Sequence, residues 1–111
     1  MTFKTADIYN LPVKYGYINA STGSAEEVVA AVTGKKIRLL SVTAIATTAV
    51  TLVFKSAATA ISPTFPLGAN AGFAAQGVFP YGLCETTAGV ALNLTLGGAV
   101  ATAVWFTYLE V

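Results

Sequence analysis

The chain contains no histidine and only one cysteine, Cys84. Without histidine it cannot form a Ser-His-Asp triad, a Cys-His pair or a histidine-ligated zinc site. A single cysteine excludes an intrachain disulfide bond and a four-cysteine metal site, and a free thiol is typical of a protein made in a reducing compartment. These absences predict that the protein is not an enzyme and binds no cofactor.

Charge is also scarce, because only 10% of the 111 residues are charged and an average soluble domain has about 25%. Six basic and five acidic residues give a net charge of +1, and Lys55, Glu85 and Glu110 are the only charges after Arg38. Nucleic-acid binders normally show a basic stripe, and electrostatic membrane binders need clustered Lys and Arg. We therefore expect neither a nucleic acid nor a membrane as partner.

The uncharged segment 86–109 is long enough to cross a bilayer as a helix. However, its large residues alternate with small or polar ones from Val90 to Leu96, and Gly97 and Gly98 interrupt it. Alternation with a period of two is typical of a strand. We also expect no signal peptide, because the first residues lack a basic stretch followed by an apolar one.

The rest of the chain shows short alternating runs separated by Gly and Pro. Such spacing predicts an all-β fold, either a sandwich or a barrel. The expected strands are 13–19, 36–43, 49–56, 58–61, 71–75, 83–86, 90–96 and 100–111. Segment 26–33 is compatible with a short helix, although its valines favour an extended strand. Residues 33–36 predict a hairpin turn in which Gly34 takes a positive φ angle.

Composition divides the chain into two parts. Residues 1–22 are polar and aromatic by turns, and Pro12 and Gly16 oppose a helix, so we expect an extended N-terminal arm. Residues 23–111 are expected to form the apolar β-sandwich body.

The last expected strand is apolar or small on both faces. A strand of an ordinary antiparallel sandwich has one polar face, and soluble monomers rarely expose large apolar patches. We therefore predict self-association through Ala101, Ala103, Trp105 and Leu109, with Trp105 as the central aromatic anchor. The alternative is a bland, uncharged surface that contacts nothing.

No motif indicates catalysis or metal binding. Gly34–Lys36 lacks the earlier Gly and the final Ser or Thr of a phosphate-binding loop. Glu26 and Glu27 are adjacent, so a strand directs them to opposite faces, and a chain with a single Asp does not predict a calcium site. Cys84 has no basic neighbour that would activate it. We expect it to be a structural thiol.

Four segments carry a resemblance to a known family. They are Gly34–Arg38 (GKKIR), Val50–Ser56 (VTLVFKS), Glu85–Leu94 (ETTAGVALNL) and Tyr108–Val111 (YLEV). Through these segments, residues 28–111 resemble small tailed-phage virion proteins of the head decoration (cement) type.

The resemblance implies a jelly-roll-like fold. With the strand pattern and the arm described above, we expect an antiparallel jelly-roll-like β-sandwich of about eight strands with an extended N-terminal arm. It also implies a virion protein on the capsid exterior, assembled in the host cytoplasm, that stabilises contacts between major capsid subunits. We expect a homo-oligomer, with a trimer favoured. The arm residues expected to dock on the major capsid protein are Phe3, Ile8, Tyr9, Leu11, Tyr15 and Tyr17.

The alternative function is a receptor- or glycan-binding module of a phage tail or head fibre. In that case, Tyr9, Tyr15, Tyr17, Phe65, Phe73, Phe79 and Tyr81 would form a platform on which sugars stack. Sugar sites also need polar side chains for the hydroxyl groups, and only Asn10, Asn19, Asn70 and Gln76 are suitable. We therefore favour packing roles for these aromatic residues.

Overall fold

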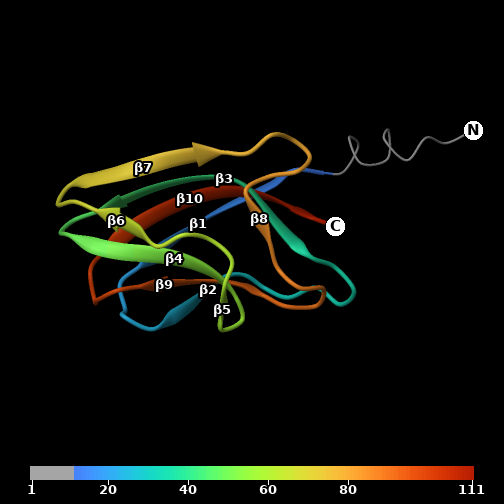
Figure 1. Cartoon of the computed structure of the whole chain (residues 1–111), viewed down its shortest axis with the longest axis horizontal. Coiled ribbons are helices and arrows are strands. Elements are labelled where there is room, and N and C mark those ends of the chain that lie inside the picture. The colour runs from blue at the N-terminus through green and yellow to red at the C-terminus, as the bar shows by residue number, and fades with distance from the viewer. Residues whose placement is uncertain (1–11) are drawn as a thin grey trace, which may run out of the picture.

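The computed structural model describes residues 12–111, and this part of the chain contains ten strands and no helix (Figure 1). The strands are β1 (Lys14–Ala20), β2 (Ala25–Val29), β3 (Ile37–Ala46), β4 (Val50–Ser56), β5 (Thr59–Ala60), β6 (Phe65–Leu67), β7 (Ala71–Gln76), β8 (Cys84–Glu85), β9 (Leu92–Leu96) and β10 (Thr102–Glu110). They form two antiparallel sheets that pack as a sandwich, which confirms the predicted fold class. Within the described residues, no helix is long and apolar enough to cross a membrane.

The strand order follows a nested pairing. Sheet A has the order β1-β10-β3-β7 with β8 also on β3, and sheet B has the order β2-β9-β4-β5 with β6 also on β4. Strands from the start of the chain pair with strands from its end: β1 pairs with β10, and β2 pairs with β9. This paired chain then rolls up, so that β10 also pairs with β3 and β9 also pairs with β4. The result is a jelly roll. The count exceeds the eight expected strands by two, because β2 forms where a short helix was the alternative and the three-residue β6 was not expected.

The segment 25–36 corrects two details of the sequence analysis. Residues 25–29 form strand β2, so the helical alternative is wrong. Gly34 does take a positive φ angle of 74°, in a turn closed by a 3.0 Å hydrogen bond from the Lys35 amide to the Val32 carbonyl. This turn is not a hairpin, however, because β2 belongs to sheet B and β3 to sheet A. It carries the chain across the sandwich instead.

β1 is an edge strand of sheet A and pairs with β10 along its whole seven-residue length. Residues 14–20 therefore lie in the sandwich, although the sequence analysis places them in the arm.

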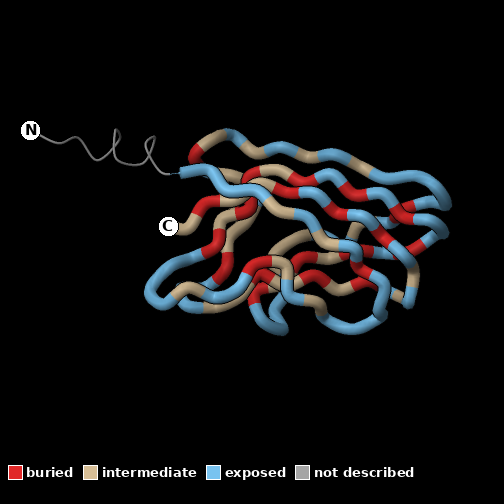
Figure 2. The backbone as a smooth tube through the Cα atoms, turned by 180° about the vertical axis from the view of Figure 1, so that it is seen from behind, coloured by how far each residue is buried: buried red, intermediate tan, exposed pale blue. Residues whose placement is uncertain are grey.

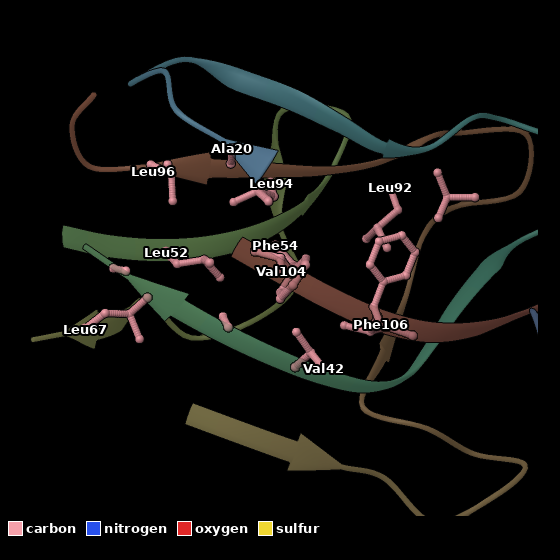
Figure 3. Packing of buried hydrophobic residues seen from close by; sticks show 14 of the residues in the cluster. Ala20, Val42, Leu52, Phe54, Leu67, Leu92, Leu94, Leu96, Val104 and Phe106 are labelled. Atoms are coloured by element: carbon pink, nitrogen blue, oxygen red, sulfur yellow. The ribbon is translucent and has the colours of Figure 1, made fainter. Parts of the chain in front are cut away.

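Along every long strand, side chains that point inward alternate with side chains that point outward. The inward ones form the core between the two sheets. Sheet B contributes mainly leucines and Phe54, and sheet A contributes both large aliphatic or aromatic residues and alanines (Figure 3). The buried residues of sheet B include Leu52, Phe54, Leu92, Leu94 and Leu96, and those of sheet A include Ala20, Val42, Ala44, Ala46, Val104 and Phe106. The inward side chains of the two sheets fill the space between them and form one core.

Candidate interaction surface

The outer faces of the two sheets differ in charge. On sheet B, the neighbouring strands place Glu27, Asn93 and Lys55 in one cross-strand row. On sheet A, three outward rows are Tyr15–Thr107–Ser41–Gln76, Tyr17–Trp105–Thr43–Ala74 and Asn19–Ala103–Ile45–Gly72. These rows contain no charged residue. Sheet A therefore presents an uncharged face, while sheet B presents an ordinary polar one.

Large side chains on this face of sheet A are strongly exposed. The exposed fraction is 77% for Tyr15, 73% for Tyr17, 64% for Trp105 and 54% for Ile45. Buried and exposed residues alternate along the strands of sheet A, so these side chains point away from the core (Figure 2). We call Tyr15, Tyr17, Thr43, Ile45, Ala103 and Trp105 the aromatic face. An apolar cluster of this kind is typical of an interaction site.

The aromatic face is hollowed beside Trp105. The hollow has a volume of about 390 Å³ and is lined by Tyr17, Ile18, Asn19, Thr43, Ile45, Ala103, Val104 and Trp105. Ala103 is small, and it separates the larger side chains of its two cross-strand neighbours, Asn19 and Ile45. Polar side-chain atoms in the lining come from Asn19 and Thr43, from the Tyr17 hydroxyl group and from the Trp105 indole N–H. The hollow is therefore suited to an apolar or aromatic group that makes few hydrogen bonds.

The structure brings two predicted sets of residues together. Tyr15 and Tyr17 are expected to dock on a capsid, and Ala103 and Trp105 to mediate self-association, yet Tyr17 and Trp105 are direct cross-strand partners. Ala101 is exposed just before β10, and its carbonyl accepts a hydrogen bond from the Thr47 amide. The other four expected arm residues, Phe3, Ile8, Tyr9 and Leu11, lie outside the described residues.

Leu109 is not part of the surface, because it is fully buried. It pairs with Arg38 across the strands, and paired residues share a face of the sheet. The Arg38 guanidinium donates to the Pro80 carbonyl and to Glu85 on that side, where the segment between β7 and β8 passes. The prediction for Leu109 therefore fails because another segment covers this end of the face.

Sequence reasoning missed the contribution of β3. Thr43 and Ile45 line the hollow, and they enter the aromatic face because β3 pairs with β10. Their alternation with buried Val42, Ala44 and Ala46 is visible in the sequence. This alternation alone did not place Thr43 and Ile45 on the aromatic face, because it does not show that β3 lies beside β10.

A second exposed apolar group lies in the turn between β7 and β8. Val78 and Tyr81 are each 74% exposed, and Leu83 is 40% exposed. We call residues 77–83 the β7–β8 turn. The turn follows the C-terminal end of β7 (Figure 1), at the Gln76–Ser41 end of sheet A. The hollow lies toward the other end of the sheet, near Asn19 and Ile45.

Ion pairs gather at the end of the sandwich near the C-terminus. Lys14 Nζ lies 2.8 Å from Glu110 Oε1, and Arg38 Nη2 lies 2.9 Å from Glu85 Oε2. The hydrogen bond to Glu110 raises the pKa of Lys14 above its ordinary value. No group of three potential metal ligands occurs in residues 12–111. The charges therefore stabilise the connections at this end of the fold and leave the aromatic face neutral.

Cys84 is predicted to react slowly with thiol reagents. Burial, together with the neighbouring Glu85 charge, raises the pKa of the thiol to about 11. At pH 8 its thiolate fraction is then about two orders of magnitude below that of an ordinary cysteine with a pKa of ~8.5. The rate of a disulfide-exchange reagent, measured from pH 7 to 11, should rise with a midpoint near 11 in the folded protein. In denaturant the midpoint should return to the ordinary value, and equal rates in the two states would contradict the burial of the thiol.

Comparison with known proteins gives no independent identification. No family model matches the chain, and no curated protein matches it.

Proposed function

We propose that this chain is a phage capsid decoration (cement) protein that binds the outer surface of the head and stabilises contacts between major capsid subunits. The observation that carries the proposal is the uncharged aromatic face on a jelly-roll sandwich. A rigid β body with an apolar contact surface is what a structural protein needs, and it requires no catalytic group. The sequence resemblance to cement proteins supports the same function.

The proposed mechanism is mechanical. Each copy contacts neighbouring capsid subunits and other copies, with a trimer as the favoured assembly. Many weak contacts then add up, because each bound site raises the effective concentration of the next. The N-terminal segment precedes β1, which begins at Lys14, and in this proposal it supplies the docking residues Phe3, Ile8, Tyr9 and Leu11.

Deletion of residues 2–12 tests the proposal. We expect the truncated protein to lose co-sedimentation with undecorated capsid shells, because four apolar docking side chains are removed. We also expect its β circular dichroism spectrum and thermal midpoint to be unchanged, since β1 begins at Lys14. A matched control is Val53→Ser on the outer face of sheet B, which should bind like the wild type. Saturation of the shells by the truncated protein at the wild-type ratio would contradict docking through the arm.

A receptor- or glycan-binding module of a fibre is the second candidate. The hollow beside Tyr17 and Trp105 favours it, because a sugar ring can stack on an exposed aromatic side chain. A sugar site also needs several hydrogen-bonding groups, and besides Tyr17 and Trp105 themselves only Asn19 and Thr43 bring polar side-chain atoms to the lining. Saturable binding on a glycan array, lost in Trp105→Ser, would favour this candidate over the cement function.

A further inference from the structure

The β7–β8 turn presents its apolar side chains on a rigid backbone. Within the turn, the Tyr81 and Gly82 amides donate to the Val78 carbonyl over 2.7 and 2.9 Å. At its ends, the Gly77 amide donates to the Leu40 carbonyl over 2.8 Å, and the Leu83 amide donates to Leu39 over 2.7 Å. Both ends are thereby tied to β3.

A side-chain contact holds the middle of the turn. Arg38 Nη1 donates to the Pro80 carbonyl over 2.9 Å, and Arg38 is itself oriented by two hydrogen bonds to Glu85 Oε2. Val78 and Tyr81 are thus strongly exposed without being on a loose loop. A preorganised apolar group loses little further entropy when it binds, which favours a role in recognition.

The hollow on the aromatic face offers a complementary environment. Its walls are mainly apolar, it is uncharged, and Asn19 and Thr43 bring polar atoms to the lining. A buried tyrosine needs an apolar surface for its ring and a hydrogen-bond partner for its hydroxyl group. The hollow supplies both kinds of surface for a side chain such as Tyr81. Tyr81 is 74% exposed and does not line the hollow, so a chain does not fill its own hollow.

We infer that the β7–β8 turn of one copy inserts into the hollow of a second copy, with Tyr81 beside Trp105 and Tyr17. This contact joins two different surfaces, so it is a head-to-tail interface. Head-to-tail interfaces form closed rings when the rotation between copies closes, and a ring agrees with the favoured trimer. The inference concerns only how copies join, and it does not depend on what surface the ring covers.

The exposed apolar area approaches the size of a specific interface. An aromatic side chain buries about 150–250 Å² when it is covered, so Tyr15, Tyr17, Trp105 and Tyr81 together offer roughly 400–700 Å² at their present exposure. Val78 and Ile45 add to this area and bring it toward the ~1,000 Å² that specific interfaces exceed. Neither surface carries a charge that would repel the other copy.

The test is the assembly of two variants, alone and mixed. Tyr81→Ser removes the inserted side chain, and Ala103→Trp fills the hollow; both positions are exposed, so the fold should be retained by circular dichroism. We expect the wild type to be an oligomer by light scattering, and each variant alone to raise the apparent dissociation constant by ~30-fold or more, as for a hot-spot residue. Val53→Ser on sheet B is the matched control and should assemble like the wild type.

Mixing the two variants distinguishes a head-to-tail contact from a symmetric one. The Ala103→Trp chain keeps its turn and the Tyr81→Ser chain keeps its hollow, so an equimolar mixture should form heterodimers. Trp105 is the only tryptophan of the wild type, and its emission in the wild type should shift to shorter wavelength as concentration rises. The mixture contains a second tryptophan from Ala103→Trp, so its assembly is followed by light scattering. A Tyr81→Ser oligomer as stable as the wild type would overturn the proposal and indicate that the aromatic face packs on itself. A wild type that remains monomeric would also overturn it, while capsid binding is measured separately.

Discussion

Replacing Phe54 with alanine should lower the free energy of unfolding by about 3–5 kcal/mol, the usual cost of Phe→Ala in a core. Phe54 is 1% exposed and lies between the sheets, in one core cluster with leucines of sheet B and with Val42 and Val104 of sheet A (Figure 3). Those neighbours sit on hydrogen-bonded strands and cannot move in to fill the space. The loss is a large part of the ~5–15 kcal/mol that holds a typical domain folded.

Thermal and urea unfolding at fixed protein concentration measure this effect. The thermal midpoint should fall by roughly 12–40 °C, since 1 kcal/mol corresponds to about 4–8 °C in a small domain. Val53→Ala is the control, because Val53 is the next residue on the same strand and points to the outer face of sheet B. Its cost should be below ~1 kcal/mol. Similar losses for the two variants would show that Phe54 does not fill the core.

Replacing Gly72 with alanine should detach β7 from sheet A. Gly72 pairs with Ile45, and a Cβ atom added there would overlap the Ala44 carbonyl oxygen and lie 2.9 Å from the Ile45 Cα atom. These are backbone atoms of a central strand, so only a shift of β7 can relieve the overlap. Overpacking of this kind costs about 1–3 kcal/mol. The loss should be at the upper end, because Phe73 then leaves its stack on Phe65, where the ring centroids are 4.6 Å apart.

Hydrogen exchange locates the damage. Amides of Ala71–Gln76 should exchange much faster in Gly72→Ala, while those of β4 and β9, in the other sheet, should lose protection only through the global change. Gly98→Ala is the matched control, since a Cβ atom there would meet nothing within 4 Å and Gly98 has no positive φ angle. Full protection of β7 in Gly72→Ala would contradict the close approach of the two strands.

Strand positions and inward faces followed from local pattern. Val50, Leu52 and Phe54 alternate with less buried residues, and the structure buries all three. The same holds for Leu92, Leu94 and Leu96. Alternation is a property of neighbouring residues in one strand, and the pleat converts it directly into a buried and an exposed face. Most expected strands therefore lie within a few residues of the observed ones.

The local sequence pattern did not predict which strands pair with one another. The turn at Gly34 was expected to join two strands of one hairpin, but the strands on either side belong to different sheets. Many partners would satisfy the alternation of β2 equally well. The choice of β9 depends on how the whole chain rolls up, which is set by the packing of all strands around one core.

The aromatic face was likewise predicted in part from the sequence and decided in part by strand pairing. The apolar second face of residues 100–111, with the absence of charge around Trp105, was evident from composition, so the chain itself established that this strand has two apolar faces. Its neighbours were decided by tertiary structure, because pairing placed Tyr17 and Thr43 on either side of Trp105 while another segment covered the end of the face at Leu109. Which side chains share a surface depends on strands that are distant in sequence, and only the folded chain brings those strands into register.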